Sequence, residues 1–273
     1  MGGMGGRVRR AGRLLLASLY PPRCLACQDY MPYDAAVARE SADPSLPSAE
    51  VCWWLCPSCA ASSIGLAGAC PRCALPADGF IDAPEVHGPC EACRHAPPAW
   101  ARAVCAFEHD GAPRRAVVRA KSRRGAAVAS GLGALLAGRV VDSLGAPAAW
   151  DTWAPGPEAW CVVPVPLHTD RLLERGFNQA GRVASEVARR LGLPLASDGL
   201  VRLTAGTDQH LQSRADRLAG LAGVYAGQPA VAGHRVALVD DVWTTGATMA
   251  ACAAAIAEAG GRVALAVAVT RTR

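Results

Sequence analysis

Two adjacent carboxylates and a run of small hydroxyl-bearing residues stand together near the end of the chain. Asp240 and Asp241 directly follow the apolar run Val236 to Val239, and the chain continues as Trp243-Thr-Thr-Gly-Ala-Thr248. The apolar run predicts a strand buried on both faces of a parallel sheet, with the acids where that strand ends. The next residues predict a tight turn and an Ala-rich helix, from Met249 to Ala259, that two glycines stop.

A strand, a polar turn and a helix N-terminus together predict a site for a phosphate group. Backbone N–H groups and the positive end of the helix dipole converge there, and Thr244, Thr245 and Thr248 can donate hydrogen bonds. Acids beside such a turn suit a ligand with both phosphate and hydroxyl groups, which is the composition of a sugar phosphate. Asp240 and Asp241 would accept hydrogen bonds from ribose hydroxyls or help to organise Mg²⁺. The alternative is a surface turn that binds nothing.

Cysteine pairs dominate the first hundred residues. Eight of the twelve cysteines form Cys-x-x-Cys pairs, which are Cys24/Cys27, Cys56/Cys59, Cys70/Cys73 and Cys90/Cys93. Two such pairs place four sulfurs around one ion, so eight thiolates predict two closed, structural zinc sites. We expect sequential pairing, first with second and third with fourth, with interleaved pairing as the alternative. The surrounding segment has few long periodic elements, so its folding should depend on zinc.

Composition sets broad limits on function. The 273 residues include 51% hydrophobic residues and carry a formal charge of +5. Of the 28 basic residues only Lys121 is a lysine, so the arginine content indicates a compositional bias more than a nucleic-acid surface. We find no apolar stretch long enough to span a bilayer, and residues 1–20 predict a short amphipathic leader helix in place of a signal peptide. We therefore expect a cytoplasmic protein.

The rest of the chain alternates between strand and helix patterns. This alternation predicts a parallel α/β sheet. A polar loop at 168–179 carries Arg171 and Arg175, and residues 200–225 predict a mobile flap or short helix. The strands are expected at 103–107, 160–163, 236–239 and 263–269, and the helices at 113–120, 126–144 and 179–190.

Several motifs resemble one family. The segment Leu238 to Thr248 resembles the phosphoribosyl pyrophosphate (PRPP) signature of type I phosphoribosyltransferases. With the four cysteine pairs, nearly the whole chain resembles the ComF family, competence-associated proteins that join a double zinc ribbon to a phosphoribosyltransferase-like domain. The further motifs are Val163-Pro-Val-Pro-Leu-His168, Arg175-Gly-Phe-Asn-Gln-Ala180 and Gln209-x-Leu211 through Arg217. Relatives carry Lys, an aromatic residue, one residue and Gly where this chain has Lys121-Ser-Arg-Arg-Gly125, so no role is assigned to Lys121.

The resemblance implies a type I phosphoribosyltransferase-like sheet at 99–273, a double zinc ribbon at 21–98, and PRPP with Mg²⁺ as ligand. Arg171 and Arg175 would neutralise charge on the pyrophosphate side, and catalysis would rest on positioning and charge stabilisation. Enzymes that act on 6-oxopurines have an Asp where this chain has Thr244, so transfer to hypoxanthine or guanine is not expected. The PRPP-binding residues would be Asp240, Asp241, Thr244, Thr245, Gly246, Ala247 and Thr248.

Two functions from different classes follow. The first is an enzyme that transfers a phosphoribosyl group from PRPP to an acceptor. The second is a non-catalytic accessory of DNA uptake that binds a competence helicase or single-stranded DNA. The two acids and the threonine turn favour ligand binding in both cases.

Overall fold

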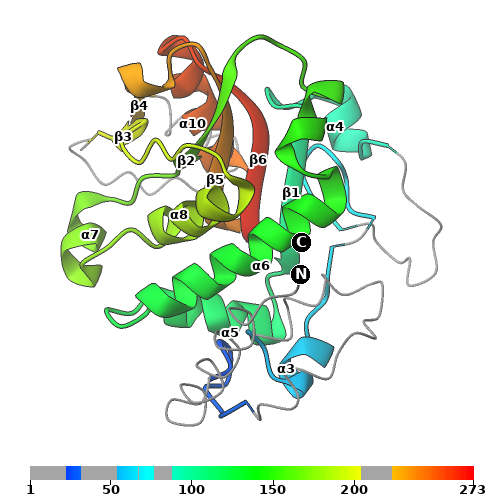
Figure 1. Ribbon diagram of the computed structural model, residues 1–273, viewed down its shortest axis with the longest axis vertical. Coiled ribbons are helices and arrows are strands. Elements are labelled where there is room, and N and C mark those ends of the chain that lie inside the picture. The colour runs from blue at the N-terminus through cyan, green and yellow to red at the C-terminus, as the bar shows by residue number, and fades with distance from the viewer. Residues whose placement is uncertain (1–22, 32–53, 67, 77–87, 204–222) are drawn as a thin grey trace, which may run out of the picture.

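A parallel sheet of four strands lies at the centre of the protein (Figure 1). It is seen in a computed structural model, which describes residues 23–31, 54–66, 68–76, 88–203 and 223–273. All three neighbouring strand pairs are parallel, which confirms the predicted α/β class. In spatial order the strands are β1 (Arg102–Glu108), β6 (Arg262–Arg271), β5 (His234–Trp243) and β2 (Ala159–Pro164).

Helices cover both faces of this sheet (Figure 1). A separate pair of short antiparallel strands lies beside α10, formed by β3 (Leu200–Arg202) and β4 (Tyr225–Gly227). The helices are α3 (Pro57–Ala61), α4 (Glu91–His95), α5 (Gly111–Ala120), α6 (Ala126–Leu144), α7 (Thr169–Arg175), α8 (Gln179–Leu191) and α10 (Ala247–Glu258), with 3-10 turns η2 (Pro147–Thr152) and η3 (Pro229–Val231).

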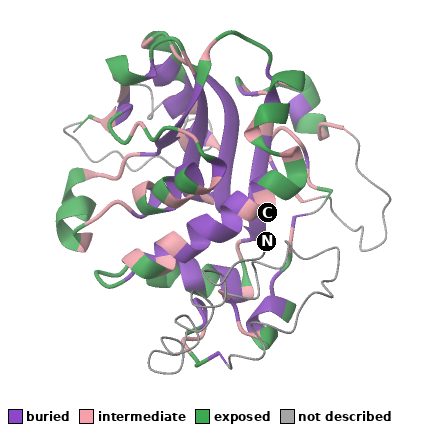
Figure 2. Ribbon diagram, viewed as in Figure 1, coloured by how far each residue is buried: buried purple, intermediate pink, exposed green. Residues whose placement is uncertain are grey.

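The strands read as unbroken apolar runs because each face of the sheet packs against a helical layer. On β5, Ala237 and Val239 belong to the core cluster that contains residues of α6 and α8, whereas Val236 and Leu238 belong to the cluster that contains residues of α10. Figure 2 shows the strands of the sheet buried between these layers. Polar residues lie at or near the carboxyl ends of three strands, Glu108 on β1, Asp240 and Asp241 on β5 and Arg271 on β6, and in open parallel sheets ligands bind at those ends.

Helix α6 is long and apolar enough to cross a membrane by length and composition, a feature that the sequence prediction did not identify. Half of its most apolar window, 50%, is buried inside this fold, and a core helix passes the same test. The helix packs closely on α8: a Cβ added at Gly133 would lie 2.6 Å from the backbone oxygen of Val183. Its apolar character is therefore explained by packing.

Three local predictions were wrong. The strand predicted to end at Val239 continues to Trp243, because β6 is equally long and pairs with it as far as Arg271. The predicted loop at 168–179 contains α7, a helix that begins after the cap residue His168, whose Nδ1 accepts a hydrogen bond from Asp170 N. The helix predicted to begin at Met249 begins two residues earlier.

Other predictions fall partly or wholly outside the described residues. Residues 1–20, predicted as a leader helix, and the Gln209 to Arg217 motif belong to this group. Of the predicted flap at 200–225, the structure describes the two ends, and these pair as β3 and β4. The division at residues 21–98 and 99–273 stays a prediction.

Candidate functional site

Asp240 and Asp241 lie near the carboxyl end of β5, one of the two central strands. The backbone N–H of Asp241 donates to Asp240 Oδ1 over 2.8 Å. Successive residues of a strand point to opposite faces, so the two carboxylates have different surroundings. Burial, together with the charge of Asp241, raises the pKa of Asp240 well above its usual range. The prediction treated these acids as equivalent, and the structure separates them.

The residues after β5 form a sharp turn into α10. Gly246 is the cap residue of α10 and adopts a left-handed conformation with φ of 86°. A Cβ there would lie 3.0 Å from Trp243 Nε1, so both the conformation and the space favour glycine. The side-chain oxygen of Thr245 accepts a hydrogen bond from Ala247 N. The turn therefore leads the threonines directly to the first N–H groups of α10, which have no intrahelical acceptor.

The structure brings Lys121 to Asp241, a contact that the sequence prediction missed. Lys121 caps the C-terminus of α5, and its Nζ lies 3.1 Å from Asp241 Oδ2. The signal for this contact is the survival of one lysine in an arginine-biased chain. Residues 121 and 241 are far apart in the sequence. They meet only in the fold, because α5 follows β1, and β6 alone lies between β1 and β5 in the sheet.

Arg171 and Arg175 both lie on α7, which follows the carboxyl end of β2. Residues four apart lie on the same face of a helix, so both guanidinium groups can address one ligand. Arg171 is exposed, whereas Arg175 is partly buried and its Nη1 has no hydrogen-bond partner among the described residues. Arg123 Nε donates to the backbone oxygen of Glu174 over 2.9 Å, so the turn that carries Lys121 also contacts α7.

The Arg175-Gly-Phe-Asn-Gln motif forms the connection between α7 and α8. Gly176 ends α7 with φ of 79°, and Phe177 packs against the main core. Asn178 Oδ1 accepts from Ala180 N at the start of α8, while Asn178 Nδ2 donates to the backbone oxygen of Val165. These contacts fix α7 relative to β2, so most of this motif is structural.

The eight paired cysteines form two clusters, and the predicted sequential pairing is confirmed. Within each cluster the four sulfur atoms lie within 4.8 Å of one another. In each cluster, a sulfur atom of one Cys-x-x-Cys pair lies at the same distance from a sulfur atom of the other pair. Cys27 Sγ lies 3.7 Å from Cys56 Sγ, and Cys73 Sγ lies 3.7 Å from Cys90 Sγ. The clusters are Cys24, Cys27, Cys56 and Cys59, and Cys70, Cys73, Cys90 and Cys93.

This arrangement fits zinc. Four sulfurs at Zn–S distances of about 2.3 Å around a tetrahedral ion lie roughly 3.8 Å apart, close to the spacing seen. The N–H of Cys90 donates to Cys70 Sγ over 3.2 Å, and a hydrogen bond of this kind stabilises the thiolate form that binds a metal. Hydrogen bonding from the Cys73 side chain, with this backbone bond, lowers the pKa of Cys70 to about 4. All four positions of such an ion would be filled by sulfur, which is typical of structural zinc.

Arginine side chains attach one cluster to helix α5 and the other to strand β6 of the sheet. Arg119 Nε, on α5, donates to the backbone oxygen of Ala26 in the first cluster over 2.9 Å. Arg271 Nε, at the end of β6, donates to the backbone oxygen of Cys73 in the second cluster over 3.1 Å. The clusters are therefore tied to α5, at whose end Lys121 lies, and to β6, which pairs with β5.

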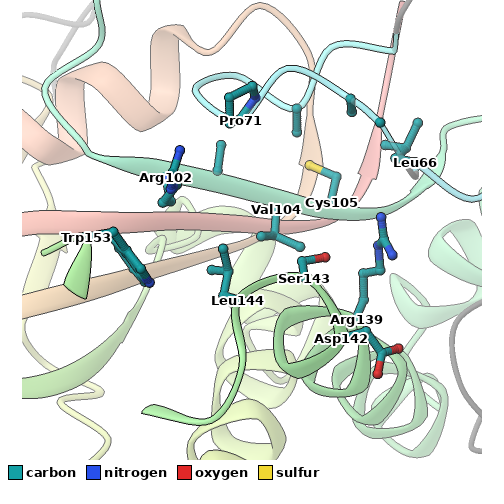
Figure 3. A pocket seen from close by; sticks show the side chains of 14 residues that line it. Leu66, Pro71, Arg102, Val104, Cys105, Arg139, Asp142, Ser143, Leu144 and Trp153 are labelled. Carbon is teal, nitrogen blue, oxygen red and sulfur yellow. The ribbon is translucent and has the colours of Figure 1, made fainter. Parts of the chain in front are cut away.

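A cavity of about 620 Å³ lies at the edge strand β1, and neither of these acids lines it (Figure 3). It is lined by the second cysteine segment, by β1, by Trp153 and by the C-terminal end of α6, from which Arg139 and Asp142 contribute. None of the predicted ligand residues lines it. The chemistry of the acids and the threonine turn is therefore separate from this cavity.

The fold and site define a phosphoribosyltransferase-like protein. Residues 178–273 match the phosphoribosyl transferase domain. The chain is 32% identical over 205 residues to the DNA utilization protein YhgH of Salmonella typhi, which covers 75% of this chain and 85% of that protein. It is 30% identical over 198 residues to the protein of that name from Escherichia coli K12, covering 72% and 82%.

A further relative is the Competence protein F of Haemophilus influenzae, 35% identical over 96 residues, or 34% of this chain and 41% of that protein. Together with the two cysteine clusters, these similarities show that the chain belongs to the ComF family. The resemblance read from the sequence motifs is thereby confirmed.

Proposed function

We propose that this protein binds a phosphoribosyl ligand, PRPP, at the carboxyl end of β5. The observation that carries the proposal is the continuous path from Asp240 and Asp241 through the Gly246 turn to the N-terminus of α10. The turn offers backbone and threonine donors to a phosphate group, and the acids offer acceptors to ribose hydroxyls. Few other ligand classes need both sets of groups within nine residues.

Magnesium fits the acidic side of this site. Carboxylate oxygens are hard ligands of the kind that Mg²⁺ prefers, and an ammonium group already lies 3.1 Å from Asp241 Oδ2, so the position attracts cations. Asp240 and Asp241 would hold the ion together with oxygens of the ligand. When bound, the ion would neutralise phosphate charge, and Arg171 and Arg175 would add positive charge from α7.

Transfer of the phosphoribosyl group to an acceptor is the proposed activity. The chain would contribute by orienting the ribose and stabilising the charge of the departing pyrophosphate, since positioning and electrostatic stabilisation dominate such reactions. Thr244, at the turn, is exposed, and its hydroxyl is a poor general base. An acceptor that needs no strong base is therefore expected. A cytoplasmic location, where cysteine clusters stay reduced, belongs to this proposal.

A non-catalytic role in DNA utilisation is the second candidate. The names of the relatives, DNA utilization protein and Competence protein F, favour it. In this case PRPP would be a regulatory ligand, and a competence helicase or single-stranded DNA would be the partner.

Incubation of the zinc-loaded protein with Mg²⁺, PRPP and a panel of bases tests both candidates. Release of pyrophosphate with one of the bases supports the enzyme. Binding of PRPP by calorimetry without release supports the accessory role. Absence of PRPP binding by folded, zinc-loaded protein contradicts the proposed function in both forms.

A further inference from the structure

The ion pair between Lys121 and Asp241 is not a surface salt bridge. The lysine side chain is 33% exposed and the aspartate side chain only 9%. A carboxylate so far removed from water needs a positive partner, and loss of that partner costs more than at the surface. Lys121 supplies this positive charge.

The turn that carries Lys121 is held in place on both sides. Ser122 Oγ donates to the backbone oxygen of Arg119 over 2.8 Å, and Arg123 Nε donates to the backbone oxygen of Glu174 on α7. A Cβ at Gly125 would lie 2.4 Å from the backbone oxygen of Ala120, so the turn requires glycine at this position. The turn therefore holds the Lys121 ammonium next to Asp241, and the same turn contacts α7, the helix that carries Arg175.

The charges around this ammonium are both positive and negative. Asp241 contacts it from β5, and the charge of the ammonium also acts on Asp240, on the other face of that strand, and on His109, which follows β1. His109 Nδ1 lies 2.8 Å from Thr270 Oγ1, and Thr270 Oγ1 donates to the backbone oxygen of Asp241. Burial, together with the charges of Lys121 and Arg114, lowers the pKa of His109. Lys121 is thus the cation in direct contact with Asp241, within a set of groups from β1, α5, β5 and β6.

We propose that Lys121 exchanges partners when the ligand binds. Before the ligand binds, it is the counter-ion of Asp241. Once ribose hydroxyls or a divalent cation engage Asp241, the ammonium moves to a pyrophosphate oxygen of the ligand. A lysine suits this exchange because its ammonium is a compact charge on a flexible stem, whereas a guanidinium forms a rigid fork. The exchange rests on the proposed function, since it needs a ligand with pyrophosphate.

The chemistry of a single lysine allows a direct test on the whole, zinc-loaded protein. Reductive methylation with ¹³C-formaldehyde labels Lys121 and the N-terminal amine, and the methylated lysine keeps its charge. The lysine signal should differ between wild type and Asp241→Asn in the absence of ligand, and Mg²⁺ with pyrophosphate should shift it in wild type. An identical lysine signal in wild type and Asp241→Asn would show that the ion pair does not form in solution.

A pair of charge-matched variants separates direct contact from general electrostatics. Lys121→Gln should weaken binding of Mg²⁺-pyrophosphate about tenfold or more, because it removes a charge-assisted hydrogen bond to the ligand. Arg124→Gln removes the same charge from an exposed residue of the same turn and should change binding less than about threefold.

The outcomes distinguish this inference from the function on which it rests. If wild type binds pyrophosphate and Lys121→Gln binds it equally well or more tightly, partner exchange is wrong and Lys121 only neutralises Asp241. If both Gln variants weaken binding alike, the effect is long-range charge and the inference also fails. If wild type binds neither pyrophosphate nor PRPP, the proposed function itself fails.

Discussion

Trp100 packs edge-on against Trp243, with ring centroids 5.5 Å apart and ring planes at 78°. Trp100 Nε1 donates to the backbone oxygen of Arg72, between the two cysteines of a pair, and Trp243 is the last residue of β5 before the threonine turn. Arg271 connects the same two segments, because its guanidinium donates hydrogen bonds to the backbone oxygens of both Cys73 and Thr244. The second cysteine cluster therefore supports the turn predicted to hold phosphate.

Loss of the second cluster should thus affect both zinc content and the turn. The wild-type protein should carry about two zinc ions, and Cys90→Ser should carry about one, because the sulfurs of each cluster form a separate site. Tryptophan fluorescence should also change, since Trp243 loses its fixed neighbour. Cys161→Ser, at a buried cysteine outside the clusters, is the control and should retain two ions. Loss of both ions in Cys90→Ser would mean that the clusters fold as one unit.

Arg271→Lys tests the link between cluster and turn without touching a metal ligand. A lysine keeps the charge but cannot hold the carbonyl oxygens of Cys73 and Thr244 together, so we expect a loss of about 1–3 kcal/mol in the free energy of unfolding. Zinc content should remain at about two ions, while PRPP binding weakens. Arg262→Lys, on the same strand but 43% exposed beside Glu158, should be nearly neutral. Equal stability of the two variants in denaturant titrations would contradict a supporting role for Arg271.

The sequence was most informative where a pattern is local. The apolar run of β5, the cysteine spacing and the glycine of the turn each predict their own structure, since strand periodicity, metal geometry and a left-handed φ act over a few residues. The extent of β5 was underestimated because pairing with β6, not the local pattern, carries the strand past Asp240. The partner of Asp241 was missed because it comes from residue 121, through the order of strands in the sheet.

The sequence could not predict that Asp240 and Asp241 have different surroundings, because the two residues are neighbours in the chain. Asp240 and Asp241 appear equivalent in the sequence, but a strand turns them to opposite faces, one toward a buried layer and one toward Lys121. Likewise, α7 was read as a loop because a seven-residue helix depends on its caps, His168 and Gly176, more than on a periodic apolar face.

Arg175→Ala should weaken binding of pyrophosphate and PRPP but leave binding of ribose 5-phosphate nearly unchanged. The reason is its position on α7, apart from the threonine turn, with a buried Nη1 that lacks a partner among the described residues. Loss of a charge-assisted hydrogen bond should lower the affinity about tenfold or more. Arg182→Ala, at an exposed position of α8, provides the control. Equal weakening for ribose 5-phosphate in calorimetry would place Arg175 at the 5′-phosphate.

Asp240→Asn should stabilise the ligand-free protein at neutral pH. The folded protein raises the pKa of Asp240, mainly by burial, so it binds more protons than the unfolded chain between the ordinary carboxyl pKa and the raised one. Stability contributed by this group is therefore lost as pH rises through that window. In Asp240→Asn this loss should be absent. Unfolding midpoints of zinc-loaded protein measured from pH 5 to 8 should diverge, with the variant above wild type at the higher pH, and parallel curves would contradict the assignment.

The joint substitution of Asp240 and Asp241 by Asn tests the residues on which the functional proposal depends most. Both side chains keep their size and most of their hydrogen-bonding capacity but lose their charge, so fold and zinc content should survive. Charge-assisted hydrogen bonds contribute roughly 1.5–3 kcal/mol each, so affinity for PRPP with Mg²⁺ should fall at least about tenfold. Calorimetry on wild type and the double variant measures this directly, with zinc content as the check on folding.

The single variants then separate the two acids. Asp241→Asn should weaken PRPP binding and also free Lys121, whereas Asp240→Asn should weaken binding while raising stability at neutral pH, so affinity and stability change in opposite directions for Asp240 alone. This opposition is expected of a ligand-binding carboxylate, because a purely structural one would lower stability when replaced. If the double variant binds PRPP as tightly as wild type, the acids do not contact the ribose, and the threonine turn alone would have to hold the ligand.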